Sequence, residues 1–144
     1  HPRPVASPPR RHRHGEAVMQ LAEDAARHGA DATIRRWLSH DRPLPGFGHQ
    51  LYPDGDPRGA ALLSVIEVDG TLSSLRDAAL AATGALPNID FGLAALTRSL
   101  GLPRDAPFRL FALARSVGWA EHTVEQITSG SVIRPRGRYE GVLV

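Results

Sequence analysis

Glycine and proline divide the chain into segments of helical length. From position 16 to 28, apolar residues recur at intervals of three and four, and Gly29 follows, as in an amphipathic helix that ends at a glycine. The same reasoning predicts a short helix capped by Asp31, a helix capped by Thr71, and further helices, giving the set 31–38, 60–66, 72–83, 88–100 and 108–127. The run at 60–66 is apolar enough for a buried helix. Because no segment alternates convincingly between apolar and polar residues, we predict an all-α fold.

The segment before the third predicted helix differs from an ordinary connecting loop. Residues 44–52 read Leu-Pro-Gly-Phe-Gly-His-Gln-Leu-Tyr. The proline fixes its own φ, and the two glycines allow backbone conformations closed to other residues, so we expect a tight turn that presents His49. Arg58 follows nine residues later, and an imidazole near a guanidinium is a good site for an anion. A Gly/Pro-rich loop with an exposed histidine and no ligand explains the spacing equally well.

Composition limits the classes of function. A length of 144 residues suits one domain or a piece of a larger fold, and a start at His1 leads us to expect a fragment, a processed chain or a mispredicted gene. The absence of cysteine excludes disulfides, thiolate catalysis and cysteine-ligated metals. All 17 basic residues are arginine, but the net charge is only +2, which makes nucleic acid an unlikely partner. With no apolar run of membrane-spanning length and no signal-peptide core, we expect a cytoplasmic protein.

Four motifs, in the same order, resemble those of the citrate synthase family. They are the Pro-Gly-Phe-Gly-His and Asp-Pro-Arg elements of the loop, then Pro-Asn-Ile-Asp-Phe at 87–91, Phe-Ala-Leu-Ala-Arg-Ser-Val-Gly-Trp at 111–119 and Ile-Arg-Pro-Arg at 133–136. The resemblance covers the chain from about Pro45 onward and matches the C-terminal third of such an enzyme. It implies a helical small domain at 15–101 and a helix and tail at 102–144 that return to a large domain. Residues 1–14, rich in proline, arginine and histidine, are predicted to be disordered.

The resemblance also implies an activity and its partners. Members of the family condense acetyl-CoA or propionyl-CoA with oxaloacetate, giving citrate or methylcitrate, so an acyl-CoA would be a co-substrate. No further cofactor and no metal are implied, and the histidines lack a convincing ligand spacing. A homodimer through the large domain is expected.

Site residues follow from the motifs by resemblance. His49 resembles the histidine that hydrogen-bonds the ketone of oxaloacetate, and Arg58 and Arg115 resemble ligands of its carboxylates. Arg134 resembles the arginine that the family contributes across the dimer interface. Three such arginines would suit the two carboxylates of a keto diacid.

Two further residues are assigned to the chemistry itself. Asp90 resembles the base that removes a methyl proton from the acyl thioester, although its position in the first turn of a helix, taken alone, favours a dipole-complementing or capping acid. His14 is the candidate for the enolate-stabilising histidine of the family's His-Gly-Gly motif. Only one glycine, Gly15, follows it here.

Two alternative functions remain open at this point. An inactive paralogue would bind a dicarboxylate or an acyl-CoA as a sensor. A helical interaction domain would bind no ligand, and a lack of convergence among His49, Arg58, Asp90 and Arg115 would support it.

Overall fold

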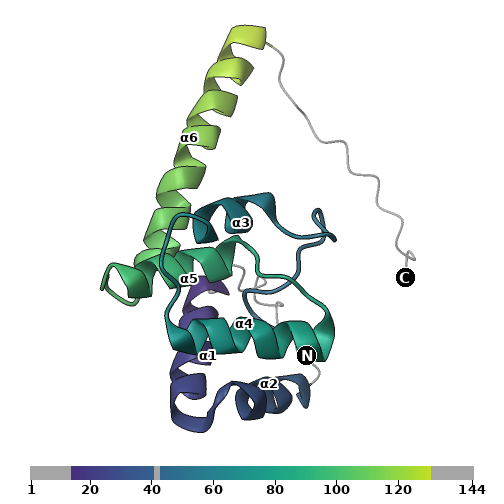
Figure 1. Cartoon of the computed structure of the whole chain (residues 1–144). Helices are drawn as coiled ribbons and strands as arrows, with labels where there is room; N and C mark the ends of the chain where they lie inside the picture. The colour runs from purple at the N-terminus through teal and green to yellow at the C-terminus, as the bar shows by residue number, and fades with distance from the viewer. Residues whose placement is uncertain (1–13, 41–42, 131–144) are drawn as a thin grey trace, which may run out of the picture. The chain divides into compact units, whose positions relative to one another are not determined.

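The computed structural model describes residues 14–40 and 43–130. The helices in these ranges, coloured from purple to yellow in Figure 1, are α1 (His14–His28), α2 (Ala30–Leu38), α3 (Pro57–Leu63), α4 (Gly70–Thr83), α5 (Ile89–Ser99) and α6 (Ala106–Ser129). The only β-type pairing in the described part of the chain is an isolated bridge between Phe47 and Pro87. The predicted all-α fold is therefore confirmed. The segment predicted to be disordered lies outside the described residues, apart from His14, at which α1 begins.

The chain divides into two compact units, with the boundary between Phe111 and Ala112 inside α6. The first unit holds α1 to α5, the first turns of α6 and the loop that carries His49. In the second unit the described residues belong mainly to α6, and its exposed apolar side chains are Leu113, Val117, Trp119, Val124 and Ile127. Across the described ranges, the helices lack the continuous apolar length that a bilayer span requires.

α1 is the central helix of the first unit, where it contacts α2, α4 and α5 (Figure 1). Val18, Leu21 and Ala22 of α1 are fully buried, because apolar residues three and four apart share one face of a helix. Phe91 of α5 is buried in the same core. Burial of one large apolar side chain stabilises a fold by about 1.5–3 kcal/mol. The core therefore fixes α5, the helix on which Asp90 lies.

α3 approaches α5 closely at a glycine. A Cβ atom on Gly59 would lie 2.7 Å from the carbonyl carbon of Asn88 and 3.0 Å from the backbone nitrogen of Ile89. A larger residue would meet backbone atoms there, which no side-chain rotation can move. The approach places Arg58, the residue before Gly59, beside the start of α5.

The helix predicted at 60–66 begins earlier and is less buried than expected. α3 begins at Pro57 with Asp56 as its N-cap, and it ends at Leu63. An aspartate followed by proline is a typical helix start, so the helix begins before the apolar run. Gly59 is the buried residue of α3, and Val65, placed inside the predicted helix, lies beyond its end and is 77% exposed. The expectation of a buried helix was wrong because only one edge of α3 packs on α5.

Two predicted helix caps were also wrong. The N-cap of α2 is Gly29, which makes no side-chain cap bond, and Asp31 lies inside the first turn. The N-cap of α4 is Asp69, whose carboxylate accepts a hydrogen bond from the backbone nitrogen of Leu72 at 3.1 Å. Thr71 is already helical. In both cases the helix starts before the predicted cap: α2 begins at Ala30 and α4 begins at Gly70.

Candidate active site

The loop before His49 is fixed to the segment before α5. The backbone nitrogen of Gly48 donates to the carbonyl of Leu86 at 2.8 Å, and that of Asn88 donates to the carbonyl of Gly46 at 2.9 Å. Gly46 and Gly48 have φ values of 84° and 69°, in the left-handed region that favours glycine. The tight turn expected from the sequence is therefore present, and it presents His49 on a backbone held from both sides.

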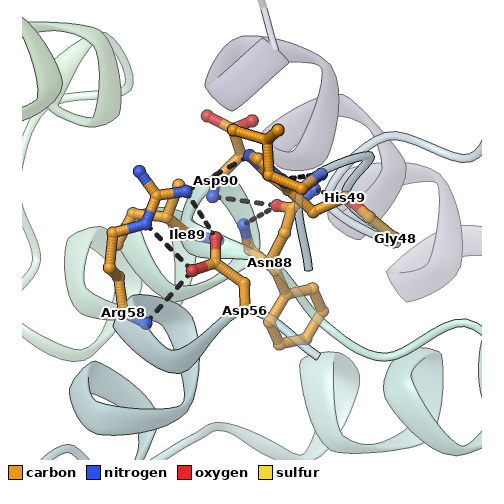
Figure 2. A network of polar contacts seen from close by, with 9 residues as sticks. Gly48, His49, Asp56, Arg58, Asn88, Ile89 and Asp90 are labelled. Atoms are coloured by element: carbon orange, nitrogen blue, oxygen red, sulfur yellow. Dashed lines mark hydrogen bonds and ion pairs between the residues drawn. The ribbon is translucent and has the colours of Figure 1, made fainter. Parts of the chain in front are cut away.

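Asn88 joins this loop to the start of α5 through its side chain. Its Nδ2 donates to the carbonyl of Gly48 at 2.9 Å, and its Oδ1 accepts from the backbone nitrogens of Asp90 and Phe91 at 2.9 and 3.4 Å. Asn88 thus caps α5 and also holds the residue before His49 (Figure 2). Together with the two backbone hydrogen bonds, this amide fixes the histidine loop relative to the helix of Asp90.

The hydrogen bonds of His49 indicate where its ring proton lies. The backbone nitrogen of Leu51 donates to His49 Nδ1 at 3.1 Å, and Nη2 of Arg58 lies 3.2 Å from His49 Nε2. A neutral imidazole has one acceptor nitrogen, and the backbone N–H of Leu51 is a fixed donor that requires it, so we assign Nδ1 as the acceptor and the proton to Nε2. Because arginine can only donate, the approach of Nη2 to Nε2 is then a contact between two donors. Nε2 and Nη2 are then two neighbouring donors that can share one acceptor oxygen of a ligand.

Arg58 is held along one edge by Asp56. Arg58 Nε lies 2.9 Å from Asp56 Oδ1, and Nη2 lies 2.9 Å from Oδ2, a bidentate pair. The guanidinium also lies over the ring of Tyr52, 5.3 Å from its centroid. The side chain of Asp56 has no exposed surface, whereas that of Arg58 is 48% exposed. One edge of the guanidinium is therefore engaged, and the remainder is open to an anion.

The environment of Asp56 keeps this pair charged. Burial alone would raise the pKa of Asp56, but hydrogen bonds from the Arg58 side chain and from the backbone nitrogens of Ile89 and Arg58 outweigh it and lower the pKa to about 2. In turn, the hydrogen bond to Asp56 raises the pKa of Arg58, and the negative charge of Asp90 adds to this effect. Asp90 is half-buried in the first turn of α5.

We expect Asp56 to make the protein sensitive to acid over a defined range. Its pKa falls from 3.8 in the unfolded chain to about 2 in the fold, so the folded state binds fewer protons. The pair therefore contributes about 2 kcal/mol above about pH 4, and this contribution is lost as the pH falls to about 2. Free energies of unfolding of the wild type and Asp56→Asn, measured by urea at several pH values, should converge on acidification. A constant difference between them would contradict the assignment, and Asp77→Asn, at an exposed carboxylate, is the control.

His49, Arg58 and Asp90 come together from three segments (Figure 2). All three are predicted from the sequence, but the residues that hold them, Asp56 and Asn88, are not. Both lie at helix N-caps, and an aspartate before proline and an asparagine before an apolar helix are recognisable cap signals. No sequence signal indicates their long-range contacts, from Asp56 to Ile89 over 33 positions and from Asn88 to Gly48 over 40 positions.

The other predicted site residues are not placed by the structure. Arg115 lies on α6 in the second unit, where its side chain is exposed, and its convergence with His49 and Arg58 stays a prediction. Arg134 lies outside the described residues, as does the side chain of His14. Within residues 14–40 and 43–130, no three His, Asp or Glu side chains are grouped so that they could hold a metal ion.

A cavity of about 320 Å³ opens on one side of His49. Its walls come from the loop and from the end of α4 and the turn after it, and they include Gly48, His49, Tyr52, Asp56 and residues 83–86. Arg58 and Asp90 are not among its lining residues, so the cavity adjoins the site at His49 and does not enclose it.

Comparisons with known proteins identify the family to which the chain is similar. A family model described as citrate synthase, C-terminal domain, matches residues 7–136. Citrate synthase 2 of Bacillus subtilis is 32% identical over 137 residues, covering 88% of this chain and 37% of that protein. The 2-methylcitrate synthase 2 of Corynebacterium glutamicum is 38% identical over 122 residues, covering 78% of this chain and 32% of that protein.

A solved structure extends the likeness to three dimensions. The crystal structure of citrate synthase from Thermotoga maritima matches with a TM-score of 0.70 and 28% sequence identity, covering 91% of this chain and 39% of that one. The chain thus spans between 32% and 39% of the length of these proteins. On the extent of the family match and the identity to these relatives, the chain belongs to the citrate synthase family.

Proposed function

We propose that this chain supplies catalytic residues of an acyltransferase that condenses acetyl-CoA or propionyl-CoA with oxaloacetate. The products would be CoA and citrate or methylcitrate. The observation that carries the proposal is the pair of donors on His49 and Arg58, 3.2 Å apart, next to the half-buried carboxylate of Asp90. Such a site can bind an oxygen-rich anion and take up a proton beside it.

In this mechanism, Asp90 removes a proton from the carbon next to the acyl thioester carbonyl. The resulting enolate carbon attacks the ketone carbon of oxaloacetate. His49 donates a hydrogen bond from Nε2 to the ketone oxygen and stabilises the negative charge that develops there. The oxygen takes up a proton along this bond and becomes the hydroxyl of the product, and solvent water returns a proton to His49. Water then hydrolyses the thioester and releases CoA. The acyl-CoA is a co-substrate, and no other cofactor takes part.

The arginines bind the two carboxylates of oxaloacetate. Arg58 offers the part of its guanidinium that Asp56 does not engage, and Arg115 and Arg134 supply further bidentate donors. Arg134 would serve the partner subunit of a homodimer. His14 would stabilise the enolate oxygen. We place the reaction in the cytoplasm.

The proposal is tested by the release of CoA from the full-length protein. Acetyl-CoA and propionyl-CoA are supplied in turn, with and without oxaloacetate, and the free thiol is followed with a chromogenic reagent. We expect release that depends on oxaloacetate, and the faster acyl-CoA identifies the substrate. Absence of release with either acyl-CoA would reject the function, whereas release without oxaloacetate would indicate a thioesterase.

A further inference from the structure

We propose that Asp56 is a positioning residue of this site: it holds the guanidinium of Arg58 and the first turn of α5 in one fixed arrangement. Neither the resemblance nor the comparisons assign a role to this carboxylate. The inference rests on the proposed function only for the identity of the ligand. The positioning itself is a property of the fold and can be measured without substrate.

The carboxylate of Asp56 accepts four hydrogen bonds (Figure 2). Oδ1 accepts from the backbone nitrogen of Arg58 at 3.1 Å and from its Nε at 2.9 Å. Oδ2 accepts from Arg58 Nη2 at 2.9 Å and from the backbone nitrogen of Ile89 at 3.0 Å. With no exposed surface on its side chain, Asp56 has no water to replace these donors if one is lost.

The arrangement decides which face of Arg58 meets a ligand. An arginine that is about half-exposed normally samples many rotamers, and fixing it costs entropy when a ligand binds. Here the Nε and Nη2 edge is already bound to Asp56, so Nη1 and the outer side of Nη2 point away from it. Arg58 is thereby pre-arranged to receive a carboxylate beside His49 Nε2, from which its Nη2 lies 3.2 Å.

The bond to Ile89 extends the same control to α5. Ile89 is the first residue of that helix, and Asp90 follows it. The buried carboxylate of Asp56 therefore binds both Arg58 and the backbone next to Asp90, although it lies 33 positions before Ile89 in the sequence. Loss of this anion would loosen both groups together.

Asp69 provides a matched comparison for this role. It too is an N-cap aspartate paired with an arginine, since it accepts from the backbone nitrogen of Leu72 and from Nε of Arg98. It lies at the N-terminus of α4, and neither Leu72 nor Arg98 is a site residue. Because asparagine caps a helix about as well as aspartate, Asp56→Asn and Asp69→Asn should each keep the cap and lose the charged pair.

The first measurement is hydrogen exchange at the arginine side chain in the 144-residue chain. By NMR, the Nε–H of Arg58 should exchange more slowly with water than that of Arg115, whose side chain is exposed. Asp56→Asn should remove this protection, and Asp69→Asn should keep it. Fast exchange of Arg58 in the wild type would overturn the proposal even if the variant did not fold, as would retained protection in Asp56→Asn.

The second measurement is the KM for oxaloacetate in the full-length protein. We expect Asp56→Asn to raise it at least about tenfold, the effect of losing one charge-assisted interaction, and Asp69→Asn to change it less than about twofold. Adding Asp56→Asn to Arg58→Lys should raise KM little further, because both changes remove the same interaction. Fully additive effects would show that Asp56 does not act through Arg58. An inactive wild type would reject the proposed function, while the exchange result would still decide the role of Asp56.

Discussion

Replacing Asp90 by asparagine in the full-length protein should lower the condensation rate at least about a hundredfold, the usual effect of losing a general base. The amide keeps the size of the side chain but cannot accept the methyl proton. The affinity for oxaloacetate should change little, since the arginines and His49 bind the dicarboxylate. A fall in kcat at constant affinity is the mark of a group that acts in the chemical step.

Asp31 offers a matched control for this substitution. It is the second residue of α2, as Asp90 is the second residue of α5, and both are acids in a first helical turn. Asp31→Asn should therefore lose only the interaction with the helix dipole, about 0.3–1 kcal/mol. Steady-state rates and oxaloacetate titrations on both variants separate the two roles. Near-normal turnover of Asp90→Asn would remove Asp90 from the mechanism and leave it as a helix-start acid.

The helices were predictable because their signals are local. Gly84 adopts φ 70° at the end of α4, as expected for a glycine that terminates a helix, and the apolar face of α1 is buried as its spacing predicts. The helix starts were predicted less well. Asp69 and Asp56 cap α4 and α3, whereas the apolar runs from which these helices are predicted lie after the caps.

The reactive residues of the candidate site could be predicted from the sequence, but the contacts that hold them in place could not. His49, Arg58 and Asp90 were found through motifs that resemble a known family, and each lies in a segment with an unusual local sequence. The bonds that bring them together join Asp56 to Ile89 and Asn88 to Gly48, across long intervals of sequence. Such contacts depend on how α3 and α5 pack, and no periodicity of a single segment encodes that packing.

Gly59→Ala should destabilise the chain and disturb the site together. The new Cβ would lie 2.7 Å from the carbonyl carbon of Asn88 and 2.8 Å from its oxygen, distances that real Cβ atoms do not adopt. Because these are backbone atoms, α3 must move away from α5. Overpacking of this kind costs about 1–3 kcal/mol. The displacement also stretches the bond between Asp56 and the backbone nitrogen of Ile89, so the KM for oxaloacetate should rise.

Gly70→Ala is the control, because it makes the same change where there is room. Gly70 is the first residue of α4, and no atom lies within 4 Å of a Cβ placed on it. Alanine favours helix over glycine by up to about 1 kcal/mol, so this variant should be as stable as the wild type or more stable. Urea unfolding of the two variants gives the free energies directly. Equal stability of Gly59→Ala and Gly70→Ala would contradict the close packing of α3 on α5. A destabilised Gly59→Ala with an unchanged KM would show instead that this packing supports the fold without setting the position of Arg58.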